Sequence, residues 1–381
     1  MDNIFELIGI RHDLHAHPEL CFEEFRTAKI VAVELAKLGV KVTTGVAGTG
    51  VVATISKGAG RRVMAIRADM DALPIHETTN LPYASRSAGR MHACGHDGHT
   101  TMLLGAARHI VHDVDFDGTV HFIFQPAEED VSGAKRMIQE GLFQRFPCDA
   151  VFALHNIPGD EVGQITVRPG PITAAVDIVE IIIRGVGGHG AIPHRAVDPV
   201  VAASGIVLAL QSVVARNVDP LDSVVITVGA IHAGTLATVI PGEVEMRVGV
   251  RTCTKDMREL VQRRIITLVE AQAKSYGCEA DISYNPGIAY PAGNNTPAHA
   301  QLVRDVAIDL GQQPANIDLR GPYMFSEDFA FMQEVVPSCY FGIGNGASRN
   351  LHDSGYDFND ELLVKGPIFW GKLVERFFAR V

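Results

Sequence analysis

A cluster of potential metal ligands lies in the stretch GRMHACGHDGHTTMLLGAA, residues 89–107. It holds three histidines, one cysteine and one aspartate before the sequence turns apolar; these are His92, Cys94, His96, Asp97 and His99. Glycines around the cluster leave the backbone free to adopt tight conformations. A simpler interpretation is a polar loop, capped by Thr100, that leads into a core helix. The rest of the chain decides between the two.

Further polar residues follow apolar runs that have the composition of buried strands. Asp69 and Asp71 end the run RVMAIRADMD, Glu128 and Glu129 follow TVHFIFQPA, His155 ends AVFALH, and His352 lies in the glycine-rich loop after SCYFGIGN. Sites in open α/β sheets are built at the carboxyl ends of strands. We therefore expect these side chains to meet the histidine-rich cluster.

The combined set suits divalent metal ions. Thiolate, imidazole and carboxylate ligands favour borderline metals such as zinc, manganese, cobalt or nickel. One thiolate, three imidazoles and one carboxylate exceed the needs of a single tetrahedral site, whereas two metals that share a bridging ligand would use them all. Each residue alone has a simpler alternative. His155 could be a core histidine, Cys94 a buried small hydrophobe, and Glu128 and Glu129 a solvated helix start. Their coincidence at strand ends favours metal.

Glu128 and Glu129 are adjacent, so their side chains diverge. One can bind metal while the other faces a metal-bound water and serves as a base near neutral pH. The residues alone do not assign the two roles.

Two other functions, dinucleotide binding and serine hydrolysis, are not supported by the motifs that they require. GVGGHG, residues 185–190, fits G-x-G-x-x-G, but no acidic residue lies between Asp198 and Asp219, and Pro193 and Pro199 interrupt the expected helix. A dinucleotide fold would need an acid about 20 residues after the glycines. The G-x-S-x-G motif of serine hydrolases is absent from the sequence.

The pattern of elements predicts two domains. Helices are expected near 4–14, 25–38 and 100–113, and they alternate with apolar strands at 51–55, 62–71, 119–125 and 150–156. This alternation indicates an α/β layer with both sheet faces covered. From Asp177 the order changes to β-α-β-β-α-β, a ferredoxin-like unit. We therefore predict a discontinuous α/β domain, 1–175 and 288–381, with residues 176–287 inserted.

Composition excludes several classes of protein. The 381 residues carry a net charge of -11, which argues against nucleic-acid binding. The six cysteines form no CxxC pair and so predict no disulfide framework. No apolar run reaches the roughly 18 residues of a membrane span, and the N-terminal region is too charged for a signal peptide. A cytoplasmic protein without membrane or nucleic-acid partners is expected.

Eight stretches together resemble one enzyme family, in order and in spacing. They are DLHAHPELCFEE, IRADMDALPIHE, MHACGHDGHTTMLLGAA, FQPAEE, GGHGAIPH, VIPGEVEMRVGVR, SEDFAFM and LHDSGYDFND. The resemblance is to the M20 metallopeptidases, above all to their amidohydrolase branch of hippurate hydrolases, N-acyl-amino-acid aminoacylases and auxin-conjugate hydrolases. It covers essentially the whole chain. It implies a mixed-sheet α/β/α catalytic domain and an inserted ferredoxin-like α+β lid that also mediates dimerisation.

The resemblance also implies roles for individual residues. Two divalent metals per subunit would be held by Cys94, His96, Glu129, His155 and His352, with Cys94 bridging. Glu128 falls on the family's general base. His96 replaces the histidine of the His-x-Asp motif found in other branches, which leaves Asp71 to support the ligands. His189 matches a lid histidine that reaches the partner subunit's active site in related enzymes, so a homodimer, or alternatively a homotetramer, is expected.

Substrate contacts are expected on the lid side. The family usually has asparagine where Thr238 stands and glycine where Phe325 stands, so these two departures put the substrate in doubt. Arg251 is a candidate for the substrate carboxylate, because its fork matches carboxylate geometry; the alternative is a surface ion pair. We expect hydrolysis of N-acyl amino acids to a carboxylic acid and a free amino acid. A dipeptidase or carboxypeptidase is the alternative within the fold, and a non-catalytic metal-binding protein is the alternative outside it.

Overall fold

The computed structural model describes residues 4–130, 132–319 and 321–379. The chain forms two compact units. The larger contains Met1–Ile172, Asn294–Gly321 and Glu327–Val381, and the smaller contains Thr173–Gly293 with Pro322–Ser326. The chain thus changes unit at 172/173 and 293/294, where the sequence predicted 175/176 and 287/288. The short segment Pro322–Ser326, which contains Phe325, belongs to the smaller unit.

The larger unit is built on a seven-stranded mixed sheet in the order β1-β2-β4-β3-β5-β15-β6. Its strands are β1 (Lys41–Val46), β2 (Gly50–Lys57), β3 (Val63–Asp69), β4 (Gly118–Gln125), β5 (Ala150–Pro158), β6 (Ile165–Thr166) and β15 (Ser338–Gly346). The central strands β4, β3, β5 and β15 pair parallel with one another, whereas β2 pairs antiparallel with β1 and β4, and β6 pairs antiparallel with β15. The predicted mixed-sheet α/β fold is confirmed.

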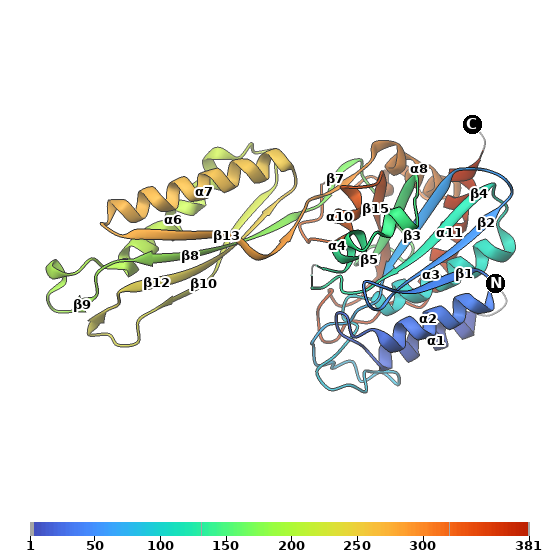
Figure 1. The fold of residues 1–381 in the computed structure, drawn as a ribbon, viewed down its shortest axis with the longest axis horizontal. Helices are drawn as coiled ribbons and strands as arrows, with labels where there is room; N and C mark the ends of the chain where they lie inside the picture. Colours follow the sequence, from blue (N-terminus) through green and yellow to red (C-terminus); the bar gives the residue numbers. More distant parts are fainter. Residues whose placement is uncertain (1–3, 131, 320, 380–381) are drawn as a thin grey trace. The chain divides into compact units, whose positions relative to one another are not determined.

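Helices cover both faces of this sheet (Figure 1). They are α1 (Ile4–Ala16), α2 (Phe25–Lys37), α3 (His96–Asp113), α4 (Gly133–Gln139), α5 (Leu142–Arg145), α8 (Pro297–Asp309), α9 (Pro314–Ile317), α10 (Phe329–Gln333) and α11 (Leu362–Phe378). One large apolar core joins α3, α8 and α11 to sheet residues such as Ile66, Phe122 and Phe152. Helices α4 and α10 contact each other and strands β4, β5 and β15. Strand β3 is buried from its second residue to its end, as expected for a parallel strand covered on both faces.

Helix α3 begins earlier than predicted. It starts at His96 instead of Thr100, so His96, Asp97 and His99 lie in its first turn. Asp97 there suits the positive end of the helix dipole. The residue before the helix, Gly95, has a φ of 91° and serves as the N-cap. A Cβ at Gly95 would lie 2.6 Å from Asn156 Oδ1, so the turn requires glycine.

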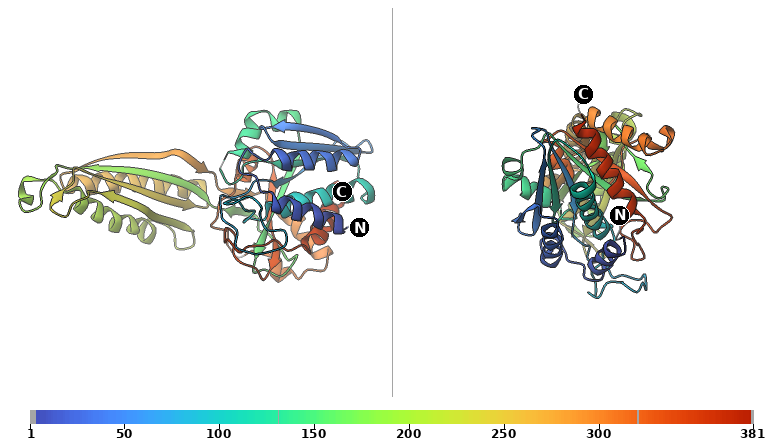
Figure 2. Two further views of the ribbon diagram at one scale, coloured as in Figure 1. Left: turned by 90° about the horizontal axis from the view of Figure 1, so that it is seen from below. Right: turned by 90° about the vertical axis from the view of Figure 1, so that its right-hand side faces the viewer.

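The smaller unit has the predicted ferredoxin-like order. Its four-stranded sheet runs β10-β12-β8-β13, with all neighbours antiparallel. The elements in chain order are β8 (Ala175–Arg184), β9 (Gly188–His189), a 3₁₀ turn (Pro193–Arg195), α6 (Pro199–Asn217), β10 (Val224–Ala233), β11 (Val239–Ile240), β12 (Glu243–Thr252), α7 (Lys255–Ser275) and β13 (Glu279–Tyr290). Helices α6 and α7 contact each other and cover one face of the sheet (Figures 1 and 2). Two short strands, β7 (Gly170–Thr173) and β14 (Gly293–Asn295), pair with each other in a separate two-stranded sheet.

Helix α6 departs from the expectation that no segment could span a membrane. By length and composition Pro199–Asn217 is apolar enough to do so, with a mean hydropathy of 1.6. A third of that window is buried inside the protein. Its buried side, which includes Ala203, Ile206 and Leu210, belongs to the core of the smaller unit. The apolar sequence of α6 is thus used in part to pack against the sheet.

Candidate metal centre and active site

The site lies at the carboxyl ends of the parallel strands of the larger unit. Asp69 ends β3, Gln125 ends β4 just before Glu128, and His155 lies on β5. The loop before α3 carries Cys94, and His352 follows β15. The parallel register of β3, β4, β5 and β15 brings these ends to one edge, which is why residues far apart in sequence converge.

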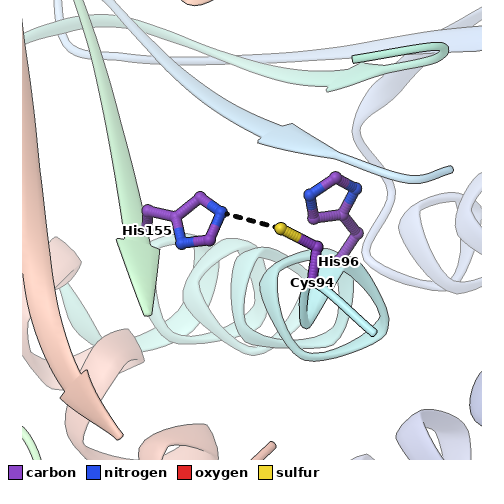
Figure 3. A group of neighbouring side chains, drawn as sticks. All are labelled: Cys94, His96 and His155. Carbon is purple, nitrogen blue, oxygen red and sulfur yellow. Dashed lines mark hydrogen bonds between the residues drawn. The ribbon is translucent and has the colours of Figure 1, made fainter. Parts of the chain in front are cut away.

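A first group of potential ligands consists of Cys94, His96 and His155. All three are buried, and one ligating atom of each lies within 4.8 Å of the others. Cys94 Sγ lies 3.4 Å from His155 Nε2. In Figure 3 the cysteine lies between the two imidazoles, with its sulfur directed at His155. Thiolate and imidazole groups at this spacing fit zinc and related metals.

A second group shares Cys94 with Glu129 and His352, again with ligating atoms within 4.8 Å of one another. His352 Nε2 lies 3.3 Å from Glu129 Oε1. His352 has a φ of 64°, in the left-handed region, and lies in the glycine-rich loop that follows β15. The two groups therefore contain all five ligands that the resemblance implied, and Cys94 is common to both.

The environment of His96 supports a cation between these groups. Its Nδ1 lies 2.9 Å from the carbonyl oxygen and 3.2 Å from the carboxylate of Asp71. Its Nε2 is buried and has no hydrogen-bond partner among the described residues. Beyond hydrogen-bond distance, Nε2 lies 3.8 Å from Asp69 Oδ2. An imidazole held by Nδ1, with a buried Nε2 that makes no hydrogen bond, is the arrangement of a metal ligand. The predicted supporting position of Asp71 agrees with this contact, and Asp71 Oδ2 also accepts the Glu129 backbone N–H at 3.0 Å.

The carboxylates buried around Cys94 and His96 also support a bound cation. Burial, together with the carboxylates of Glu129 and Glu128, raises the pKa of the Cys94 thiol well above its usual range. Burial would lower the pKa of His96, but Asp69 and Asp71 outweigh it and raise that pKa to about 10. Bound divalent cations would reverse this pattern, because they stabilise thiolate and neutral imidazole. The residues present therefore fit a metal centre.

Glu128 is buried next to the first ligands. A carboxylate oxygen of Glu128 lies within 4.8 Å of ligating atoms of His96 and Glu129. Glu128 also forms a group of the same spacing with the carboxylates of Glu327 and Asp328. The Asp328 backbone N–H donates to Glu128 Oε1 at 3.3 Å. Burial, and then repulsion from Glu327 and Glu129, raises the pKa of Glu128 well above its usual range. A carboxylate with a raised pKa is a stronger proton acceptor.

Residues of the smaller unit form two separate clusters. His189 on β9 is the register partner of Val239, and the Gly190 N–H donates to the Thr238 carbonyl oxygen at 2.8 Å, so Thr238 lies beside the exposed His189 turn. Arg251, near the end of β12, donates from Nη1 to the Met324 carbonyl oxygen at 3.0 Å and to Ser326 Oγ at 3.1 Å.

Phe325 lies in the segment that Arg251 binds. Its ring stacks on Tyr323 at a centroid distance of 4.8 Å, and its carbonyl oxygen accepts the Ala174 N–H at 3.0 Å. The structure thus brings Arg251 and Phe325 to one segment of the smaller unit.

Comparison with known proteins settles the family. Residues 65–376 match the family model of peptidase family M20/M25/M40. The chain belongs to peptidase family M20/M25/M40. It is 40% identical over 373 residues to a hippurate hydrolase of Campylobacter jejuni, a match that covers 98% of this chain and 96% of that one. It is 38% identical to an N-acetylcysteine deacetylase of Bacillus subtilis, over 96% of this chain and 95% of that one.

A solved M20 structure shares the fold throughout. It is a Bacillus subtilis protein described as a dinuclear metal-binding peptidase of the M20 family, with a TM-score of 0.85 and 33% identity. The match covers 98% of both chains. The resemblance read from the sequence motifs is therefore confirmed at the level of family and branch.

Several residues of this M20 site were not assigned from the sequence. Buried Arg67 donates to Asp69 at 2.7 Å and to Glu327 and Asp328 at 3.0 Å each. An arginine inside the apolar run RVMAIRADMD was the available signal, because a buried guanidinium requires carboxylate partners. His99, noted in the motif without a role, lies 2.6 Å from both Asp69 Oδ1 and Asn156 Oδ1. These contacts orient the strand ends behind the ligands.

Proposed function

We propose that this chain hydrolyses the amide bond of N-acyl amino acids, of the hippurate or N-acetyl type, to a carboxylic acid and a free amino acid. The observation that carries the proposal is the pair of ligand groups that share Cys94, with the buried carboxylate of Glu128 beside them. The hippurate hydrolase and N-acetylcysteine deacetylase relatives support the substrate class.

Five residues would hold two divalent metal ions. They are Cys94, His96, Glu129, His155 and His352, with Cys94 shared. Manganese, zinc, cobalt and nickel all suit this mixture of donors. When bound, the metals would supply Lewis acidity towards the scissile carbonyl and towards the attacking water. Asp71 would hold His96 and the Glu129 backbone in place through the contacts described above.

Glu128 would carry out the proton transfers. Its carboxylate accepts a proton from water as the water oxygen bonds to the carbonyl carbon. When the C–N bond breaks, Glu128 returns that proton to the leaving amine nitrogen, so protons balance over the cycle. The raised pKa of Glu128 suits the first step, because a weaker acid has a more basic carboxylate.

The smaller unit would contribute substrate contacts. We propose that His189 of a second copy in a homodimer stabilises the oxyanion of the tetrahedral intermediate, with a homotetramer as the alternative assembly. Arg251 would bind the substrate carboxylate, and Thr238 and Phe325 would shape specificity. Exposure of His189 in its turn supports access to a substrate. A cytoplasmic location is part of the same proposal.

A substrate panel tests the proposed function. Hippurate, N-acetyl amino acids and unacylated dipeptides are assayed side by side with metal-reconstituted protein. We expect hydrolysis of the acylated substrates to be favoured. Preference for dipeptides would instead support the peptidase alternative, in which a carboxylate must receive the free α-amino group. No hydrolysis of any amide by fully metallated protein would support a non-catalytic metal-binding protein.

A further inference from the structure

The residue that precedes Glu128 has an unusual backbone conformation. Ala127 has a φ of 51°, in the left-handed region that alanine rarely adopts, and its side chain is fully buried. It lies two residues after the end of β4, between Pro126 and Glu128. Such a conformation persists when surrounding contacts impose it, and it is common at functional sites. The contacts of Ala127 therefore determine where the next two side chains point.

Both polar groups of Ala127 are held. Its N–H donates to the Glu24 carboxylate, Oε1, at 2.9 Å, and its carbonyl oxygen accepts the Gly133 N–H at 3.0 Å. A Cβ at Gly133 would lie 1.7 Å from the Pro126 carbonyl oxygen, so this close approach requires glycine. Glu24 comes from a segment 103 residues earlier in the chain. A long-range side chain thus fixes the entry to the Glu128–Glu129 turn.

Glu24 is itself firmly placed. It is fully buried, and Oε1 also accepts the Phe22 N–H at 3.0 Å. Its other oxygen, Oε2, accepts the Thr49 hydroxyl at 2.6 Å. A buried carboxylate that accepts several hydrogen bonds has little freedom to turn. It can therefore act as a rigid support for Ala127.

We propose that Glu24 is a positioning residue that sets the direction of Glu128 and Glu129 by fixing the left-handed peptide at Ala127. The inference rests on the proposed function for the roles of Glu128 and Glu129. Among the described residues, Glu24 belongs to neither of the ligand groups. It acts through the backbone, so its loss would turn both side chains at once, the proton carrier and the metal ligand.

The chain contains a second contact of the same backbone type, which serves as a control. Ala47, in the turn between β1 and β2, has a φ of 55° and is also buried. Its N–H donates to the Glu140 carboxylate, Oε2, at 2.7 Å. In both places a glutamate carboxylate accepts the N–H of a left-handed alanine, but Glu140 is exposed whereas Glu24 is buried. None of the residues directly after Ala47 is a ligand or catalytic candidate, so Glu140→Met removes the same kind of backbone contact at a place away from the site.

The experiment compares three full-length variants with the wild type. Glu24→Met removes the acceptor, Glu24→Gln keeps an oxygen at the same reach, and Glu140→Met is the control. Each chelator-treated protein is titrated with Co²⁺, whose visible absorption reports ligand geometry and affinity. The hydrolysis of hippurate and N-acetyl amino acids and the melting temperature are measured on the same preparations.

We expect Glu24→Met to weaken Co²⁺ binding, alter its spectrum and lower kcat, by about 10- to 100-fold, the usual effect of losing a supporting contact. Glu24→Gln should restore spectrum and kcat, and Glu140→Met should change only the melting temperature. A wild-type spectrum and kcat in folded Glu24→Met, or equal losses in Glu140→Met, would overturn the proposal.

A fourth variant covers the case in which Glu24→Met does not fold. Thr49→Val removes the hydroxyl that orients Glu24 and retains the side-chain shape. It should shift the Co²⁺ spectrum in the same direction by a smaller amount, and an unchanged spectrum and kcat would overturn the proposal. The Co²⁺ readout also separates the two hypotheses: if the wild type hydrolyses no substrate in the panel, the effect of Glu24 on the metal spectrum is still decided.

Discussion

Cys94 Sγ lies 3.4 Å from His155 Nε2, and the same sulfur belongs to the group formed with Glu129 and His352. The sulfur is therefore the common member of two sets of potential ligands. If each set held one cation, Cys94 would be the ligand that both cations share. The other four residues each belong to only one of these two sets.

Removal of metal should abolish activity. Chelation is expected to eliminate amide hydrolysis, and manganese, cobalt, zinc or nickel should restore part of it, because the donors suit all four. Full activity in a preparation shown by elemental analysis to be free of metal would contradict the binuclear proposal.

Cys94→Ala and His352→Ala should differ in metal content. Cys94 belongs to both ligand groups and His352 to the second alone. We expect Cys94→Ala to weaken both metal equivalents and His352→Ala to weaken one. The measurement is Mn²⁺ binding stoichiometry and affinity by calorimetry, with circular dichroism to confirm folding. Equal loss in the two variants would argue against a shared thiolate.

Glu128→Gln and Glu129→Gln should separate proton transfer from metal binding. General-base assistance contributes about 10²–10⁴-fold, or roughly 3–5 kcal/mol in activation free energy. Glu128→Gln should lose turnover by this factor and retain metal, whereas Glu129→Gln should lose metal occupancy. Turnover and metal content of both variants are the readouts, and the reverse result would exchange the two assignments.

Stability should fall at alkaline pH because of the buried His15–Asp97 pair. His15 Nδ1 lies 2.9 Å from Asp97 Oδ2. Burial would lower the pKa of His15, but Asp97 outweighs it and raises the pKa to about 9. The folded state therefore binds the proton more tightly than the unfolded state, whose histidine titrates near the ordinary value of about 6.5. The contribution is complete below about 6.5 and is lost as the pH rises through about 9.

The size of that loss is measurable. A shift of this extent corresponds to about 3 kcal/mol in the free energy of unfolding, with both charges buried. Urea unfolding at pH 6 and at pH 9.5 should show the decline in the wild type, and His15→Gln should flatten it. A decline of the same size in His15→Gln would assign the pH dependence to other groups.

The sequence predicted much of the fold and which polar residues should meet, for an identifiable reason. Buried apolar runs that end in polar residues must share one edge when the strands are parallel, so the cluster at 92–99 could be grouped with Glu128, Glu129, His155 and His352 without a structure. The choice of five ligands within that group came from the family resemblance. The start of α3 was wrong by four residues, because glycines and histidines read as a loop while Gly95 in fact caps the helix.

Other features depend on long-range contacts that no local pattern contains. Arg67 meets Glu327 across 260 residues, and Glu24 meets Ala127 across 103. The left-handed conformation of Ala127 has no signature in its residue type, because alanine normally avoids it. Side-chain supports of this kind become visible only when the tertiary structure is known.

Complementation between subunits tests the proposed role of His189. We propose that His189 of one subunit acts at the metal site of the other subunit, where it donates a hydrogen bond to the oxyanion. Loss of such a donor costs about 10²–10³-fold in turnover, and His189→Ala should retain metal because His189 belongs to none of the ligand groups found among the described residues. Inactive Glu128→Gln is mixed with inactive His189→Ala under conditions that allow subunits to exchange.

The expected recovery of activity follows from how the two defects are distributed over the two sites of a mixed dimer. One site then carries both defects and the other carries neither, so about half of the wild-type activity should return per mixed dimer. Native mass spectrometry verifies that exchange has occurred, and Glu128→Gln mixed with Glu129→Gln is the control. Both residues of that control act within one subunit, so each site of its mixed dimer keeps a defect and no activity should return. Verified exchange without recovery in the His189 mixture would mean that His189 acts within its own subunit or has no part in catalysis.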